Sequence, residues 1–320
     1  MSPSDGVFEA LGQFADAVRS ATRATAPGDP ESQLLAPTQR LLEVIGRSLA
    51  RRLTIVAETS VHGLGRPDCC VEDRGVWIGY VELKAPGKGA DPEQYRGHDR
   101  RQWDRFRQLP NLIYTDGSEF ALYRTGTRVG PLLRFSGRVD QTGRRAITRQ
   151  HAEQFRQLYA SFLAWEPAAL PGQPTARDIA DLLAPLCRLL REEVEEAAGV
   201  PDSALSQVAA EWRELLFPDA DNHRFADAYA QTVTFALLLA RAEGARVNDI
   251  AGAIPALAAR HALLSRALEV LTADAARQEA RMSLRVLQRV IDRLPTDALG
   301  RADGQHDPLL YFYEHFLAAY

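Results

Sequence analysis

The chain has 320 residues, of which 46% are hydrophobic and 25% charged, with a formal net charge of −4. This is the composition of a globular protein with room for about two domains. The opening residues mix acidic and apolar side chains, unlike a secretory signal, and the longest apolar run, residues 233–240, is far shorter than the roughly 20 residues of a membrane span. We therefore expect a cytoplasmic protein with no membrane partner.

Periodicity and turn residues predict the secondary structure of the first half. Residues 1–35 are typical of a short helix followed by a loop rich in proline and glycine. An amphipathic helix begins near Pro37, with Leu41, Ile45 and Leu49 on its buried face. Three β-type segments, a helical stretch in one or two pieces and a hairpin follow, at residues 53–61, 68–72, 76–84, 92–109 and 112–124.

Beyond residue 150 the strand signals end, and six or seven helices are expected. The division is therefore an N-terminal helix and linker over 1–35, an α/β domain over 36–150 and a helical domain over 151–320. These segments carry net charges of −3, +7 and −8. A basic unit beside an acidic one is typical of a phosphate-facing domain joined to a scaffold, although uneven helix-surface charge is the alternative. Residues 308–316 are strongly apolar and aromatic, which suggests that the chain has been cut after them or that this segment docks on another molecule.

Lysine is nearly absent from this chain. Lys84 and Lys88 are the only two, while arginine supplies the other 36 basic side chains. Arginine carries a wide, planar guanidinium group, whereas lysine carries a compact ammonium group with a pKa that its surroundings can change. A chemical role can therefore require lysine and exclude arginine. Lys84 follows Glu82 by two residues, which indicates a specific role. Lys88 lies in a glycine-rich turn, where chance retention is the simpler interpretation.

The strand expected over residues 76–84 places Ile78, Tyr80, Glu82 and Lys84 on one face, because side chains alternate. Glu82 and Lys84 are therefore neighbours. An arbitrary pair of this kind on an edge strand would be a solvated ion pair, which is the alternative to a functional role.

Asp68 is expected to join the same face through hairpin pairing. A three-residue loop at residues 73–75 would pair Glu72 with Val76 and place Asp68 opposite Tyr80. Asp68 would then lie diagonal to Glu82, at roughly 7–8 Å between backbones. A two-residue loop would turn Asp68 to the other side.

Two carboxylates and a lysine that converge at the end of a sheet favour a divalent cation, Mg²⁺ or Mn²⁺, together with a substrate phosphate. Asp68 and Glu82 would bind the ion, because like charges this close resist joint ionisation without one. Lys84 would orient the attacking water or neutralise the developing charge. The residues therefore predict phosphodiester hydrolysis.

The segments Arg66-Pro67-Asp68 and Glu82-Leu83-Lys84 resemble the PD-(D/E)xK nuclease motif. Residues 79–88, 98–103 and 111–117 further resemble the N-terminal nuclease of restriction-modification enzymes that fuse nuclease, helical connector and adenine-N6 DNA methyltransferase. The resemblance covers residues 36–135, and more loosely 217–239 and 307–320. It implies an α/β restriction-endonuclease-like core, with a mixed sheet flanked by helices, followed by an all-α domain.

The resemblance also implies roles for single residues. Asp68 and Glu82 would hold the metal and Lys84 would serve the water. Related nucleases often carry a glutamine, and an aromatic residue four positions later, near the DNA backbone. Gln102 and Phe106 have this spacing, with Phe106 where tyrosine is commoner. Many members also have a glutamate ahead of the motif.

Further candidates surround this set. Glu43 on a helix or Glu58 on a strand would supply the additional glutamate, and a solvent-facing glutamate is the alternative for Glu43. His62 and His98 are placed where they could contact phosphate, although structural or solvent roles are common for such histidines. A set of arginines on one helix would position the DNA backbone or form a solvated face: Arg96, Arg100, Arg101, Arg105 and Arg107.

Other motifs are missing. The three cysteines form no CxxC pair, which argues against a zinc site and thiol chemistry, and the sequence has no GxxxxGK[ST] loop or methyltransferase signature. We expect a Mg²⁺-dependent endonuclease of a restriction-modification or phage-defence system, with double-stranded DNA and a methyltransferase domain or subunit as partners. A non-catalytic DNA-binding or assembly subunit, and a repair or recombination nuclease, are the alternatives.

Overall fold

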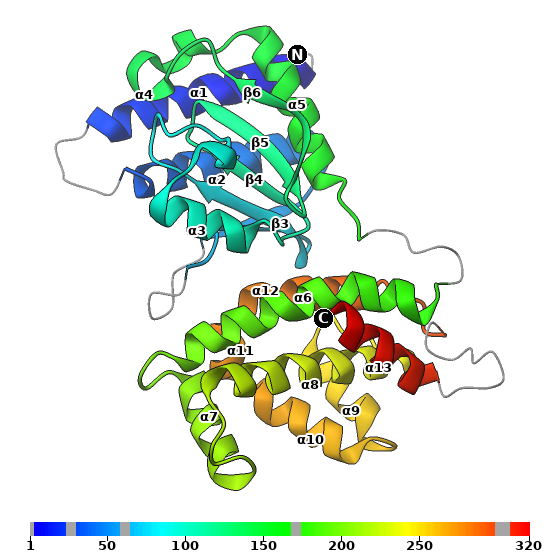
Figure 1. The fold of residues 1–320 in the computed structure, drawn as a ribbon. Coiled ribbons are helices and arrows are strands. Elements are labelled where there is room, and N and C mark those ends of the chain that lie inside the picture. Colours follow the sequence, from blue (N-terminus) through cyan, green and yellow to red (C-terminus); the bar gives the residue numbers. More distant parts are fainter. Residues whose placement is uncertain (1–2, 24–29, 58–64, 168–173, 298–307) are drawn as a thin grey trace. The chain divides into compact units, whose positions relative to one another are not determined.

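The computed structural model describes residues 3–23, 30–57, 65–167, 174–297 and 308–320. The chain divides into two compact units, one formed by the described residues up to Glu166 and the other by those from Pro167 onward (Figure 1). The first unit combines a sheet with helices, and the second contains only helices among its described residues. The predicted class, an α/β core followed by a helical domain, is confirmed.

A mixed six-stranded sheet forms the centre of the first unit. Its spatial order follows the chain, from β1 to β6. Only β3 and β4 run parallel, and the chain between them forms the short helix η1 and helix α3; all other neighbours are antiparallel. The bounds are β1 Leu53–Ala57, β2 Cys69–Asp73, β3 Val76–Leu83, η1 Pro92–Gln94, α3 Gly97–Phe106, β4 Leu112–Thr115, β5 Glu119–Arg124 and β6 Thr127–Arg134.

Helices cover both faces of this sheet. Apolar side chains of α1, α2 and α5 share one core with Val81 and Leu83 of β3. On the other face Trp103 of α3 packs against the rings of Tyr114 and Tyr123, at 5.6 and 5.0 Å between centroids. The remaining elements of this unit are α1 Pro3–Arg23, α2 Ser32–Ser48, α4 Val139–Thr142, η2 Gly143–Ala146 and α5 Arg149–Leu163.

The units divide at residue 166 rather than at the expected residue 150. Helix α5 packs its buried side chains into the core of the sheet, and α1 does the same from the N-terminal side. Both helices therefore belong to the α/β unit, whereas the sequence boundaries at residues 35 and 150 would have separated them from it.

The β2–β3 hairpin has a different turn from the one expected. Asp73 pairs with Val76 across a two-residue turn, Arg74-Gly75, in which both residues have positive φ. The three-residue loop pairing Glu72 with Val76 is therefore wrong. A β-bulge follows, because Glu72 pairs with Trp77 while Val71 pairs with Gly79. The bulge inserts one extra residue into β3. Beyond it, the residues of β2 again share a face with the β3 residues that the predicted turn would have placed beside them.

The inserted residue is Ile78, which has no partner on β2. Ile78 lies in the core with Val81 and Leu83, so its predicted placement beside Tyr80 and Glu82 is wrong. The two-residue turn alone would have turned Asp68 away, but the bulge compensates for it. Beyond the bulge Cys69 pairs with Val81, and the same register continued by one residue sets Asp68 directly opposite Glu82 rather than opposite Tyr80.

A buried carboxylate, Asp116, joins two loops at the carboxyl ends of β3 and β4. Its Oδ2 accepts hydrogen bonds from the backbone N–H groups of Gly87 and Gly89, at 3.0 and 2.9 Å. Its Oδ1 accepts from Ser118 and Glu119, at 2.9 and 2.8 Å. Four N–H donors thus fix the loop after β3 to the β4–β5 turn.

The second unit is built around long helices, and its described part contains eight of them. With α5 the described residues beyond 148 form nine helices, against the six or seven expected after residue 150. Buried carboxylates cap two of these helices. Glu193 accepts from Ser283 N at 2.8 Å, and Glu279 accepts from Ala204 N and Leu205 N. The bounds are α6 Ala176–Ala198, α7 Ala204–Leu215, α8 Asn222–Ala242, α9 Ile250–Ala258, α10 Ala262–Leu271, α11 Asp274–Glu279, α12 Arg281–Ile291 and α13 Pro308–Ala319.

The aromatic C-terminal segment packs within its own unit. Phe312 and Phe316 of α13 are buried, and both rings contact Phe235 of α8, at 5.6 and 5.3 Å between centroids. Arg188 of α6 donates to the carbonyl of Ala319 at 2.6 Å. The aromatic pattern therefore reflects packing against α6 and α8 of this chain. None of the described helices has the length and apolar composition needed to cross a membrane.

We predict that Asp116→Asn lowers the free energy of unfolding by about 2–4 kcal/mol, because an amide NH₂ would face N–H donors of the two loops. Urea unfolding followed by tryptophan fluorescence measures this change. Three of the four tryptophans, Trp77, Trp103 and Trp165, lie in the first unit and report on it.

The control is Asp104→Asn, at an exposed position with one ion pair to Arg100. Its effect should stay within about 0.5 kcal/mol, as is usual for surface pairs. Equal effects of the two substitutions would contradict the role given to Asp116.

Candidate active site

The carboxyl end of β3 carries a buried ion pair. Glu82 and Lys84 are 2% and 1% exposed, and Lys84 Nζ lies 2.7 Å from Glu82 Oε1. Strand β3 lies between β2 and β4, and Lys84 N donates to the carbonyl of Thr115 at 2.8 Å. The alternative of a solvated pair on an edge strand is therefore wrong.

Asp68 lies beside this pair. Its Oδ2 accepts a 2.7 Å hydrogen bond from the backbone N–H of Leu83, the residue between Glu82 and Lys84. Burial raises the pKa of Asp68 to about 6, against the opposing effects of the Leu83 hydrogen bond and the Lys84 charge. The structure thus brings Asp68, Glu82 and Lys84 together, as the sequence predicts.

Burial, followed by the charge of Asp68, raises the pKa of Glu82 well above its ordinary value. These two carboxyl groups therefore resist joint ionisation, which is the condition that a bound cation relieves.

Helix α3 supplies two further partners for Lys84. Lys84 Nζ donates to Gln102 Oε1 at 2.5 Å and lies 3.5 Å from Asp99 Oδ1. Burial alone would lower the pKa of Lys84, but the nearby carboxylates, Glu82 first, raise it above its ordinary value. An ammonium group has three N–H donors, and Lys84 has three acceptors. The structure therefore connects the predicted Gln102 to Lys84.

Sequence reasoning missed Asp99 and Glu31. Asp99 precedes Gln102 by three residues on the same helix, so helical spacing could have identified it. Glu31 directly precedes α2, accepts from the backbone N–H of Ala85 at 3.0 Å, and adds negative charge near Asp68, Glu82 and Lys84. Only tertiary packing places it there, and no local signal marks it.

The other glutamate candidates are not part of this set. Glu43 lies on α2 in a surface pair with Arg47, at 4.0 Å, so the solvent-facing alternative describes it. Glu58 and His62 lie outside the described residues. His98 is exposed on the first turn of α3.

The arginines of the α3 region do not form one uniform patch. Arg100 pairs with Glu93 and Asp104. Arg96 donates to the backbone carbonyls of Glu93 and Tyr95. Arg101 is exposed and has no ion-pair partner in the described part of the chain.

Two residues at the end of α3 face inward. Arg105 is half-buried and lies over the ring of Phe106, at 5.2 Å from its centroid. Phe106 is fully buried and its ring is part of the packing beneath α3, so the spacing that it shares with related nucleases does not place it at the surface. Arg107, which follows α3, is exposed.

The donor set fits a divalent cation held by two carboxylates. Glu82 Oε2 is buried and has no hydrogen-bond partner among the described residues. No cluster of three or more acidic, histidine or cysteine side chains suited to a metal occurs in the described ranges, so water and substrate oxygens would complete the coordination, as Mg²⁺ commonly allows. The contacts above link four carboxylates to two ammonium groups, an excess of two negative charges when all are ionised: Asp68, Glu82, Glu31 and Asp99 against Lys84 and Lys88.

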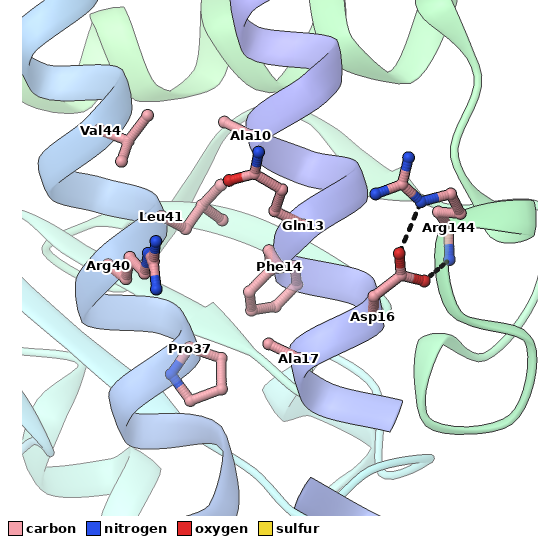
Figure 2. Close-up of a pocket in the computed structure, with 10 residues that line it drawn as sticks. All are labelled: Ala10, Gln13, Phe14, Asp16, Ala17, Pro37, Arg40, Leu41, Val44 and Arg144. Atoms are coloured by element: carbon pink, nitrogen blue, oxygen red, sulfur yellow. Dashed lines mark hydrogen bonds and ion pairs between the residues drawn. The ribbon is translucent and has the colours of Figure 1, made fainter. Parts of the chain in front are cut away.

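A separate hollow of about 360 Å³ lies between α1 and α2. Figure 2 shows Phe14 and Leu41 among its apolar lining and the ion pair between Asp16 and Arg144 at one side. None of the residues around Lys84 lines this hollow, so it is distinct from the candidate active site.

Comparisons with known proteins give little guidance on function. No protein-family model and no curated protein matches the chain. Among solved structures, the chain is similar to the cryo-electron-microscopy structure of a DrdV–DNA complex, with 18% identity and a TM-score of 0.34. The match covers 98% of this chain but 29% of that one, so this chain spans less than a third of its length. Function must therefore be inferred from the side chains of the site.

We predict that Asp68→Asn stabilises the metal-free protein at pH 8, by up to about 3 kcal/mol. The folded-state pKa of Asp68, about 6, lies above the ordinary value of 3.8. In the wild type, the contribution of the Asp68 carboxyl group to the free energy of unfolding is therefore fully present below pH 3.8, and it is lost as the pH rises through 6. The difference in free energy of unfolding between Asp68→Asn and the wild type should therefore shrink toward zero near pH 4. Urea unfolding in the presence of EDTA measures this difference at each pH.

The exposed substitution Asp104→Asn again serves as the control and should differ from wild type by less than about 0.5 kcal/mol at each pH. A pH-independent difference for Asp68→Asn would show that its carboxylate is not held at an energetic cost.

Proposed function

We propose that the first unit is a metal-dependent DNA endonuclease, of the kind found in restriction-modification or phage-defence systems. The observation that carries this proposal is the buried convergence of Asp68, Glu82 and Lys84, with Glu82 Oε2 left without a partner. Two carboxylates and one ammonium group at the end of a central strand suit the hydrolysis of a phosphodiester. The unpartnered Glu82 Oε2 is an acceptor that a bound cation could use.

Each residue has a definite task in this proposal. Asp68 and Glu82 would hold Mg²⁺ or Mn²⁺, which, when bound, lowers the pKa of a coordinated water and offsets charge on the phosphate. Lys84 places a positive charge beside the reacting phosphate, where negative charge develops. Gln102 fixes the ammonium group of Lys84 through its 2.5 Å hydrogen bond.

DNA as the substrate, and a restriction-type system, rest on the sequence resemblance. The role of the second unit as a connector to a methyltransferase domain or subunit also rests on that resemblance. The described residues of this unit offer no set of side chains comparable to Asp68, Glu82 and Lys84.

A non-catalytic DNA-binding platform is the second candidate. It is favoured by one observation: Lys84 Nζ is buried, donates to Glu82 and Gln102 and lies 3.5 Å from Asp99, so its ammonium group already has three partners before any water or phosphate binds. Such a platform would bind DNA but show no metal-dependent turnover.

We predict that Asp68→Asn, Glu82→Gln and Lys84→Met each reduce nicking of supercoiled plasmid by at least about a hundredfold, because each removes a charge that the reaction requires. Single-turnover rates over a Mg²⁺ titration measure the effect. Glu43→Gln is the control and should cleave at the wild-type rate, since Glu43 lies in a surface pair with Arg47. Wild-type cleavage by all three site variants would refute the proposal, and binding without any turnover would favour the platform.

Metal binding can be tested without turnover. Mg²⁺ should raise the melting temperature of the wild type, because a ligand that binds only the folded state stabilises it. The same titration should leave Glu82→Gln unchanged. Equal shifts in the two proteins would place the ion elsewhere.

A further inference from the structure

The two lysines of the chain meet at one carboxylate. Lys88 Nζ lies 2.6 Å from Asp99 Oδ2, and Lys84 Nζ lies 3.5 Å from Asp99 Oδ1. The only two amino side chains in 320 residues therefore share a partner. Chance retention of Lys88, the simpler interpretation of the sequence, does not explain this convergence.

The two ammonium groups differ in what they are free to do. Lys84 is buried, donates to Glu82 and Gln102 and lies within ion-pair distance of Asp99. The Lys88 side chain is 43% exposed, and its second partner, Glu31 Oε1, is 3.7 Å away. Partly exposed ion pairs contribute little net stability, so Lys88 can exchange its partners readily. Asp99 would still have Lys84 as a partner after such an exchange.

The backbone of Lys88 is held by its neighbours, whereas its side chain is partly exposed. Gly87 and Gly89, on either side, have positive φ and donate to the buried carboxylate of Asp116. Arg138 adds a hydrogen bond to the carbonyl of Pro86 at 3.0 Å. The loop thus presents a partly exposed cationic side chain from an anchored backbone, beside the candidate active site.

The charge of the site calls for such a group. Without Lys88, the four linked carboxylates would exceed the single ammonium group of Lys84 by three charges when all are ionised, so even with one divalent ion bound the site would stay negative toward a polyanion. We propose that Lys88 is a phosphate-binding residue of this site, and that on binding of nucleic acid its ammonium group leaves Asp99 and Glu31 for a backbone phosphate adjacent to the scissile one. This inference rests on the proposed function, since it assumes a nucleic-acid substrate.

The salt dependence of DNA binding tests the inference. Lys88→Gln should reduce the slope of log K against log salt concentration by about one unit, because one phosphate contact is lost. At 0.15 M salt this corresponds to about fivefold weaker binding. Lys88→Arg retains the charge and should keep the wild-type slope. Binding is measured on duplexes of unrelated sequence, with Ca²⁺ in place of Mg²⁺ and also in EDTA.

Arg47→Gln provides the matched loss of one positive charge. Arg47 lies sixteen residues beyond Glu31 along α2, about 24 Å away at 1.5 Å per residue. The salt-dependence slope of the Arg47→Gln variant should therefore equal that of the wild type. Melting temperatures of all variants should match the wild type, which excludes a folding defect as the cause.

The outcomes separate the two proposals. A wild type that cleaves DNA, with unchanged slope in Lys88→Gln, overturns the role of Lys88 and leaves the nuclease intact. A Lys88-dependent slope in a protein that never cleaves supports the phosphate contact and removes the nuclease. Absence of any DNA binding overturns both, and an equal loss in Arg47→Gln overturns the specific role of Lys88.

Discussion

The buried pair between Glu82 and Lys84 sets the requirements for the rest of the first unit. Removing two charges from water costs roughly several kcal/mol per ion, and the mutual attraction compensates only when further polar partners are present. Gln102 and Asp99 supply these partners to Lys84, while Glu82 Oε2 remains unpaired. One carboxylate oxygen of the pair is thus left open to a further partner.

The surrounding fold keeps these side chains in place through backbone contacts. The parallel pairing of β3 with β4 brings the ends of both strands to the same edge, and the intervening helix α3 places Asp99 and Gln102 there. Asp116 fixes the loop that leaves β3 by accepting four N–H bonds. Precision therefore comes from the central strands and their anchored loops rather than from the long helices on the opposite face.

The sequence predicted much of this arrangement because its strongest signals are local. Alternation along β3 places Glu82 beside Lys84, and glycine-containing turns locate the hairpins. The β2–β3 turn was predicted incorrectly, yet Asp68 still reached the right face. The unforeseen bulge at Ile78 offset the shorter turn, and only the parity of the pairing determines the face.

The predictions that failed depended on non-local packing. Glu43 had the right residue type on the right helix, but Glu31, at the start of that helix, lies next to the site. Phe106 had the expected spacing from Gln102, but apolar burial determined its position. The number of helices beyond residue 150 was underestimated because short helices carry little periodic signal.

The near-absence of lysine has a consequence for the reactivity of this protein. Guanidinium groups resist acylation, so apart from the chain's α-amino group, amine-directed chemistry has only two side-chain targets, and both lie at one end of one strand. Lys88 is open to solvent and Lys84 is enclosed, so their accessibilities differ widely. Acetylation or carbamylation of lysine side chains would therefore be confined to the candidate active site and the loop that follows it.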